Sequence, residues 1–231
     1  MAATSALAWL QSPELPTAAR AWTVTLLIPL PFLMVLQARQ LAELTTLPRR
    51  AAYISSIASL WVLALVTVVV ARQSAFSPRT IGFFAAPLVP VLIWTLALTA
   101  GGIAVLLLFR AAGIREAPIL QDLLPRSPHD RVLFAVLSIS AGICEEVAFR
   151  GFLLHALATA TGSRALAVVL SSGAFAVVHA YQQPLGALRA GLLGAMLAAP
   201  LLAGQPIYAP IFAHAFIDLL SGLWLARYLL R

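Results

Sequence analysis

The sequence predicts an all-α protein, a polytopic transmembrane bundle of about seven helical spans, with six to eight as the range. Apolar residues make up 61% of the 231 residues and charged residues only 10%, whereas a soluble domain carries about 25% charge. The apolar residues form long runs, close to the roughly 20 residues that a helix needs to cross a bilayer. Most of the basic residues lie in the polar breaks between these runs. These three observations identify an integral membrane protein.

Seven apolar runs are candidate spans: residues 21–41, 51–71, 87–109, 131–157, 164–180, 186–203 and 207–229. Pro29 and Pro31 predict a kink in the first span, because proline removes a helical hydrogen bond. Pro90 lies at the start of the third. Later helix starts or bends are marked by Pro184, Pro206 and Pro210. The sixth span is rich in Gly and Ala, which allow close approach of neighbouring helices.

The longest polar connection is residues 110–131, which we expect to be a loop with a short surface helix. It divides the chain into an N-terminal segment (1–20), the first three membrane helices with this loop (21–127), and a C-terminal domain (128–231). The first twenty residues lack a basic region ahead of an apolar one, so we expect no cleaved signal peptide. The single cysteine, Cys144, excludes an intrachain disulfide and a cysteine-based zinc site.

The net charge of +7 reflects how the helices are oriented in the membrane and does not indicate a nucleic-acid partner. The number of arginines alternates between successive polar connections. Ten lie on one side (Arg39, Arg49, Arg50, Arg110, Arg115, Arg126, Arg131, Arg189, Arg227 and Arg231) and four on the other (Arg20, Arg72, Arg79 and Arg164). The positive-inside rule then predicts a cytoplasmic C-terminus and an outside N-terminus. All fifteen basic residues are arginine, and Ala and Leu are abundant. This composition is typical of a GC-rich bacterial genome, so we expect the bacterial plasma membrane.

Six of the ionisable residues inside the predicted spans form the candidate set: Glu145, Glu146, Arg150, His179, His214 and Asp218. An ionised group at the bilayer centre costs about 2.5–3.5 kcal/mol, so such residues are candidates for function. Their spacing is helical. Glu146 and Arg150 are four residues apart and share a helix face, while Glu145 points about 100° away. His214 and Asp218 also lie one turn apart, so the carboxylate can orient the imidazole.

This set fits hydrolysis of a peptide bond, which needs a water held by a base and groups that stabilise an oxyanion. Glu145 is the candidate base, and His179 can hold the same water. His214 and Asp218 can serve the oxyanion or position the substrate. Alternatively Glu145, His179 and His214 bind Zn²⁺, because two histidines, a carboxylate and a water form a known catalytic zinc set. The cofactor prediction is therefore none or zinc, and the H-E-x-x-H signature is absent.

Three motifs then carry a resemblance to a known family. "EEVAFR" (145–150) fits EExxxR, "FAVVH" (175–179) fits FxxxH, and "HAFID" (214–218) fits HxxxN/D. In this order, each in an apolar span, they resemble the type II CAAX prenyl endopeptidase and bacteriocin-processing family (CPBP) over residues 128–231. The resemblance implies an intramembrane protease, often described as a metalloprotease, that cleaves a membrane-associated protein or peptide. Members often carry Asn at the position of Asp218, and an ionised Asp cannot donate to an oxyanion.

Three other interpretations remain open. Intramembrane Glu, His and Arg are also found in transporters and proton relays. A member of the family can also act without proteolysis, as a bacteriocin-immunity or scaffold protein. Glu146 and Arg150 can be a packing pair alone. The predicted spans also leave one mismatch: Glu145 lies about 21 Å from the start of its helix at Arg131, whereas His179 falls near the cytoplasmic end of the next span.

Overall fold

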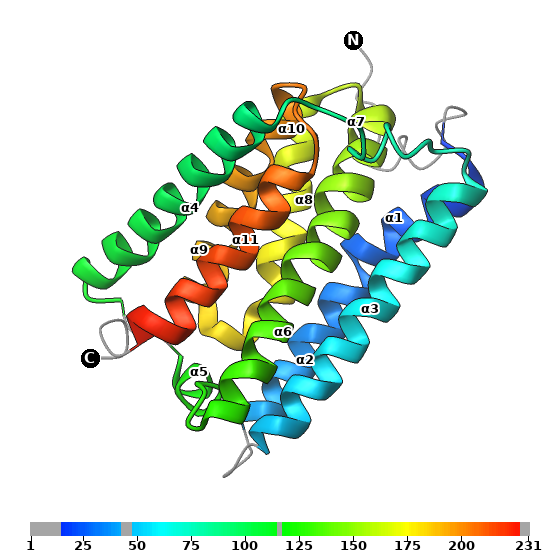
Figure 1. Ribbon diagram of the computed structural model, residues 1–231. Coiled ribbons are helices and arrows are strands. Elements are labelled where there is room, and N and C mark those ends of the chain that lie inside the picture. The colour runs from blue at the N-terminus through cyan, green and yellow to red at the C-terminus, as the bar shows by residue number, and fades with distance from the viewer. Residues whose placement is uncertain (1–14, 43–47, 115–116, 227–231) are drawn as a thin grey trace.

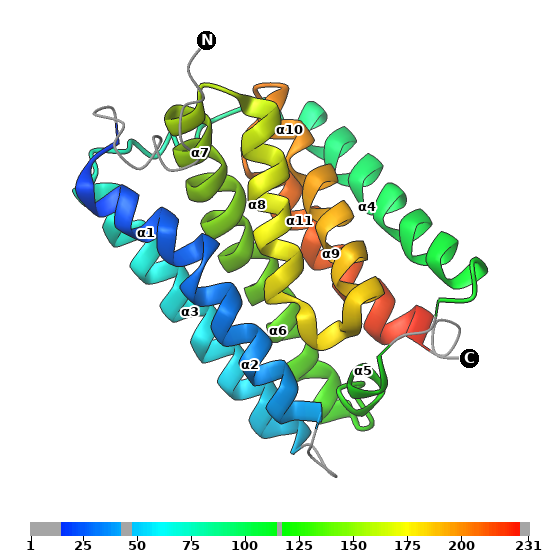
Figure 2. The same ribbon diagram turned by 180° about the vertical axis from the view of Figure 1, so that it is seen from behind.

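Helices form all the regular structure of the residues that this computed structural model describes, which are 15–42, 48–114 and 117–226. The all-α prediction is confirmed. Figures 1 and 2 show a central group of helices, α6 to α9 and α11, flanked on one side by α4 and on the other by α1 to α3. The flanking helices α3 and α4 expose large apolar side chains such as Leu65 (64%) and Leu96 (68%). An apolar outer surface of this kind is typical of helices that face lipid.

The N-terminal part contains α1 (Thr17–Leu27), α2 (Pro29–Ala42) and α3 (Arg49–Gln73). The backbone bends at Ile28, where φ is −126° and ψ is −70°. This is the kink predicted from Pro29 and Pro31, and α1 and α2 together form one span, Thr17–Gln40. Helix α3 packs against α6, and α2 packs against α8.

The remaining helices follow in the order α4 (Leu88–Ala111), α5 (Pro118–Asp122), α6 (Pro128–Glu145), a π-helix (Glu146–Leu153), α7 (Leu154–Thr161), α8 (Arg164–Val178), a 3₁₀ turn (Ala180–Gln182), α9 (Gln183–Leu197), α10 (Ala199–Leu202), α11 (Tyr208–Leu220) and a second π-helix (Ser221–Leu225). The short helix α5 is the surface helix predicted between residues 110 and 131. The segment from α6 through the π-helix to α7 is one continuous helix of 34 residues, Pro128–Thr161.

Six helices of the described residues are long and apolar enough to cross a membrane, which makes this an integral multi-pass membrane protein. The fifth predicted span, 164–180, corresponds to α8, an apolar helix of only 15 residues. In both views α8 runs beside α9 as a hairpin, so the chain still reverses direction as a seven-helix count requires (Figures 1 and 2). The predicted end of the last span (227–229), Arg115, Arg227, Arg231 and most of segment 1–20 lie outside the described residues.

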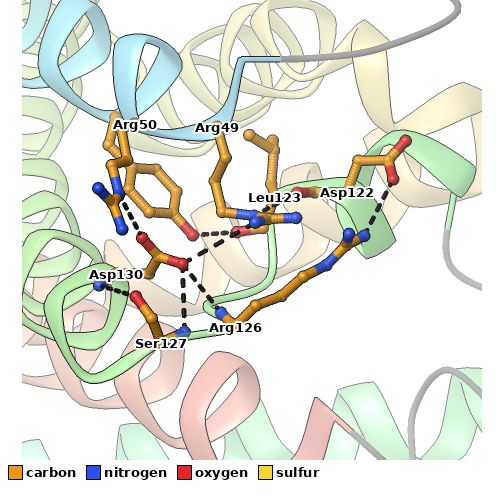
Figure 3. A network of polar contacts seen from close by, with 8 residues as sticks. Arg49, Arg50, Asp122, Leu123, Arg126, Ser127 and Asp130 are labelled. Carbon is orange, nitrogen blue, oxygen red and sulfur yellow. Dashed lines mark hydrogen bonds and ion pairs between the residues drawn. The ribbon is translucent and has the colours of Figure 1, made fainter.

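The start of α6 is held by a polar network around Asp130 (Figure 3). Ser127 and Asp130 form a capping box, in which each side chain accepts a hydrogen bond from the other residue's backbone N–H. Asp130 also accepts from the backbone N–H of Arg126 at 3.2 Å and from Nε of Arg50 at 2.8 Å. Both carboxylate oxygens are therefore bonded, and the first turn of α6 is joined to the first turn of α3.

The same network holds α5 against α3. The Tyr53 hydroxyl donates to the carbonyl oxygen of Leu123, and Nε of Arg49 donates to the carbonyl oxygen of Asp122 at 2.6 Å. These bonds cap carbonyl groups that the short helix α5 leaves free at its C-terminal end. The loop between the N-terminal helices and the C-terminal domain is thus anchored at the end of the bundle where α3 and α6 begin.

Candidate active site

Helix α8 ends inside the bundle, and this places His179 at the depth of Glu145. Counted from Thr161, Glu145 lies 16 residues back along its helix, or about 24 Å. His179 lies 15 residues beyond Arg164, or about 22 Å from the same end of the bundle. The 3₁₀ turn Ala180–Gln182 then reverses the chain (Figure 2). His179 follows the end of its helix, as the sequence predicted, but α8 is too short to cross a membrane, so the predicted mismatch in depth does not exist.

Side chains from three helical segments converge on the carboxylate of Glu145, at the end of α6. Its Oε2 lies 3.9 Å from Nε2 of His179, which follows α8, and 3.8 Å from Nε2 of His214, in α11. The three side chains are 10–16% exposed, so the site is enclosed but not sealed. The convergence predicted for Glu145, His179 and His214 is present in the structure.

Hydrogen bonds to Nδ1 determine how the two imidazoles are presented. Nδ1 of His179 lies 2.8 Å from the carbonyl oxygen of Phe175, which can only accept, so Nδ1 carries the proton. Nδ1 of His214 lies 2.8 Å from Oε1 of Glu146 and donates to that carboxylate. Both histidines thus direct Nε2 toward Glu145.

Glu146 is the residue that orients His214. The spacing in the sequence had predicted Asp218 for this role. Nε2 of His214 lies 3.8 Å from Oδ2 of Asp218, too far for a hydrogen bond. The side chain of Asp218 is 38% exposed and lies at the more open side of the site. Asp218 lies one turn after His214 on the same face of α11. The carboxylate that bonds the imidazole nevertheless comes from another helix.

Glu146 and Arg150 form the predicted i,i+4 pair, with 2.9 Å between Oε1 and Nη1. Both are almost completely buried, at 0% and 2% exposure. Nε of Arg150 also donates to the carbonyl oxygen of Gly194 at 3.3 Å, and its guanidinium lies 4.1 Å from the centre of the Phe175 ring. The same Oε1 of Glu146 accepts from Arg150 and from His214, which links the ion pair to the site.

Gly194 is a site residue that the sequence analysis did not identify individually. A Cβ at this position would lie 2.4 Å from Nη2 of Arg150, so a side chain here displaces the guanidinium. The signal was present in the Gly- and Ala-rich composition of the sixth predicted span, which indicated close helix packing. Composition alone could not say which glycine faces Arg150.

The π-helical geometry of Glu146–Leu153 was also not predicted. A π-turn contains more residues than an α-turn, and π-segments inside α-helices occur frequently at functional sites. All eight residues of this segment are buried. The widened turn changes the phase of the residues that follow, so the direction of Arg150 relative to Glu145 depends on it.

Three buried polar atoms of the cluster have no hydrogen-bond partner among the described residues: Oε2 of Glu145, Oε2 of Glu146 and Nη2 of Arg150. Buried polar atoms without a protein partner are commonly satisfied by water in folded proteins. The cluster therefore has the polar capacity to hold water at membrane depth.

The donor atoms of Glu145, His179 and His214 are spaced more widely than the ligands of a bound zinc ion. Ligands at 2.0–2.1 Å in a tetrahedral site lie about 3.4 Å apart, whereas the Glu145–histidine separations are 3.8 and 3.9 Å. Within the described residues no group of three His, Cys, Asp or Glu side chains has metal-binding geometry. No chemical step is therefore assigned to a metal below.

Comparison with known families gives a match over residues 127–220, to the family model described as type II CAAX prenyl endopeptidase Rce1-like. This range contains all three motifs and every residue of the cluster. The match confirms the resemblance seen in the sequence. Comparisons with curated proteins and with solved structures give no match.

Proposed function

We propose that this protein, whose residues 127–220 belong to the type II CAAX prenyl endopeptidase Rce1-like family, hydrolyses a peptide bond of a membrane-associated protein or peptide. The observation that carries the proposal is the position of Glu145, whose Oε2 lies within 4 Å of Nε2 of both His179 and His214. A water between these atoms is held by groups able to accept its protons. The family supports a CAAX protease-like peptidase, and the roles of individual residues are our proposal.

In the proposed reaction, a water donates one hydrogen bond to the Glu145 carboxylate and one to Nε2 of His179. This directs a lone pair of the water oxygen toward the substrate. Glu145 takes a proton as the water oxygen attacks the carbonyl carbon, and the carbonyl oxygen becomes negatively charged. The carbon–nitrogen bond then breaks, and the proton held by Glu145 moves to the departing amine.

Glu146 and Arg150 act through His214. Arg150 compensates the buried charge of Glu146, and Glu146 fixes the imidazole of His214 through Nδ1. His214 thereby keeps Nε2 at the reacting position. Asp218, more exposed than the others, contacts and positions the substrate.

The test is Glu145→Gln, which keeps the shape of the side chain and removes its basicity. The purified protein is placed in proteoliposomes with N-palmitoylated peptides of randomised sequence, which the acyl chain retains in the bilayer. Mass spectrometry detects new termini. We expect the wild type to cut a subset and Glu145→Gln to lose at least about 10³-fold in kcat. The surface variant Asp122→Asn serves as control and keeps full turnover.

Unchanged cleavage by Glu145→Gln contradicts the proposed role of this residue. A proton flux through the same vesicles that depends on Glu145, without cleavage of any peptide, supports the transporter interpretation instead.

We propose that water activation needs no metal. The wide spacing of the three donors, 3.8 and 3.9 Å from Glu145 to the two histidines, supports this. Metal analysis of the purified protein tests this. Stoichiometric zinc that is lost in His179→Ala would overturn the metal-free mechanism, and we expect no such zinc.

We also propose that the end of the bundle where α3 and α6 begin faces the cytoplasm. Arg49, Arg50 and Arg126 lie in the network at this end (Figure 3), as the positive-inside rule favours for the cytoplasmic side. In a Cys144→Ser background, Arg126→Cys should be protected from a membrane-impermeant maleimide added to intact cells. Arg79→Cys, in the loop at the opposite end, should react. The reverse pattern would invert the topology.

A further inference from the structure

The proposed reaction puts a negative charge on the substrate's carbonyl oxygen in a site that already contains three carboxylates. Glu145, Glu146 and Asp218 all lie around His214. A developing oxyanion there needs a hydrogen-bond donor, and removing one such donor from a protease typically costs 10²–10³ in kcat. Few donors of the described side chains around the site are free to act in this way.

The nitrogen donors already face other groups. Nδ1 of His179 donates to the Phe175 carbonyl oxygen, and Nδ1 of His214 donates to Glu146. Nε2 of His214 carries a proton only when the ring is charged, and it faces the carboxylates of Glu145 and Asp218, each 3.8 Å away. Arg150 uses Nη1 on Glu146 and Nε on the Gly194 carbonyl oxygen. The ring of Phe175 covers its guanidinium, which is 2% exposed, so Nη2 does not reach a substrate.

Tyr181 provides a donor that is not committed. It follows His179 by two residues, in the 3₁₀ turn, and the centres of the two rings lie 5.8 Å apart. Its hydroxyl oxygen accepts a hydrogen bond from Nε2 of Gln182 at 3.2 Å. Because the oxygen is the acceptor in that bond, the hydroxyl proton is left to donate elsewhere. The two ring planes are tilted by 34° to each other, and this contact with His179 places Tyr181 beside the site.

Arg189 determines the orientation of the Gln182 amide. Nη2 of Arg189 donates to Oε1 of Gln182 at 3.3 Å. Since arginine can only donate, the amide oxygen must face Arg189 and the amide nitrogen must face Tyr181. Arg189 is 6% exposed, so this arrangement is held inside the protein. The chain of hydrogen bonds from Arg189 through Gln182 polarises the Tyr181 hydroxyl as a donor.

We propose that the hydroxyl of Tyr181 donates a hydrogen bond to the oxyanion that forms when water attacks the substrate, and that Tyr181 is a catalytic residue of this site. Gln182 and Arg189 are positioning residues that act through it. The proposal rests on the proposed peptidase function. It assigns stabilisation of the oxyanion to a side chain outside the three motifs, two residues after His179 in the chain.

Tyr181→Phe tests the proposal, because it removes the hydroxyl and keeps the ring against His179. With one peptide selected from the wild-type cleavage experiment, we expect kcat to fall about 30- to 300-fold and KM to change less than threefold. Tyr208→Phe is the matched control. Its ring packs on Phe83, 5.9 Å between centres, at the start of α11, and kcat should stay within twofold. Gln182→Leu should lower kcat about three- to tenfold, again with KM little changed.

Equal kcat for Tyr181→Phe and wild type overturns the proposal, and so does a loss that appears in KM alone. Thermal unfolding of each variant in detergent separates a catalytic loss from misfolding. If Tyr181→Phe does not fold, Gln182→Leu decides, since a wild-type kcat there contradicts the relay. A fully active Glu145→Gln overturns the proposed function itself, whereas an inactive Glu145→Gln with a fully active Tyr181→Phe overturns the role of Tyr181 alone.

Discussion

The two ends of helix α6 carry carboxylates in opposite states. At its start, Asp130 has both oxygens bonded, to Arg50 and to the backbone N–H groups of Arg126 and Ser127 (Figure 3). At its end, Glu145 and Glu146 each keep one buried oxygen without a partner among the described residues. The same helix thus has a saturated polar network at one end and an unsaturated one four turns later.

The difference in hydrogen bonding separates a network that holds the structure from one that can bind a further group. A capping box and an ion pair at the bundle end give α6 a defined start and leave no capacity for another ligand. At membrane depth an unmade hydrogen bond is costly, because little water is available to replace it. The two unpartnered oxygens beside two histidines give this end of α6 the hydrogen-bonding capacity that the proposed reaction requires. Four predictions test this contrast, from the largest expected effect to the smallest.

Removing one partner of the buried ion pair should have the largest effect. Arg150→Leu leaves the Glu146 carboxylate charged with only His214 as a partner, and we expect a loss of about 3–5 kcal/mol in unfolding free energy, with no turnover. The double variant Glu146→Leu/Arg150→Leu should recover most of that stability without turnover, because no uncompensated charge remains. Unfolding in detergent micelles measures both. If the double variant is as unstable as Arg150→Leu, the two side chains stabilise the protein through packing, and the loss does not come from an unpaired charge.

Gly194→Ala should have an intermediate effect. The new Cβ lies 2.4 Å from Nη2 of Arg150, so the guanidinium must move, and we expect a loss of about 1–3 kcal/mol. Turnover should fall about tenfold, since His214 is held through the same carboxylate as Arg150. The control is Gly173→Ala in α8, where an added Cβ meets nothing within 4 Å. That change should leave turnover intact and stabilise the helix by about 0.5–1 kcal/mol.

Asp130→Asn should lower stability and spare catalysis. Loss of the charged acceptor weakens the bonds to Arg50 and the cap, so we expect Tm to fall by about 3–8 °C. Because the site is four turns away, kcat/KM should stay within about threefold at a temperature where the variant is folded. Differential scanning fluorimetry and the peptide assay measure the two quantities. A large loss of turnover with unchanged Tm would show that Asp130 takes part in the site. It would contradict the proposed difference between the two ends of α6.

The smallest effect is expected for Arg126→Gln. Its ion pair with Asp122 spans 3.4 Å between side chains that are 65% and 56% exposed. Pairs of this kind contribute little and are screened by salt, so Tm should change by less than about 1 °C. A larger shift in Tm that disappears at high salt would show that the exposed ion pair contributes more to stability than the buried part of the network does.

The sequence by itself determined the class of the protein and the identity of its polar residues. Length and composition predict membrane helices, Pro29 and Pro31 predict the bend at Ile28, and the spacing of Glu146 and Arg150 predicts their ion pair. All of these are local properties, because helical periodicity relates residues that are a few positions apart. The three motifs also named the six candidate site residues, which the structure brings to one region.

Only the tertiary structure decided how those residues meet. The short helix α8 set the depth of His179, and Glu146 proved to be the partner of His214 in place of Asp218. The carbonyl oxygen of Gly194 and the hydroxyl of Tyr181 entered the description through contacts that no motif contains. Each of these depends on where one helix ends or how it rotates against another. Such relations follow from packing between segments distant in the chain, and local sequence patterns do not encode them.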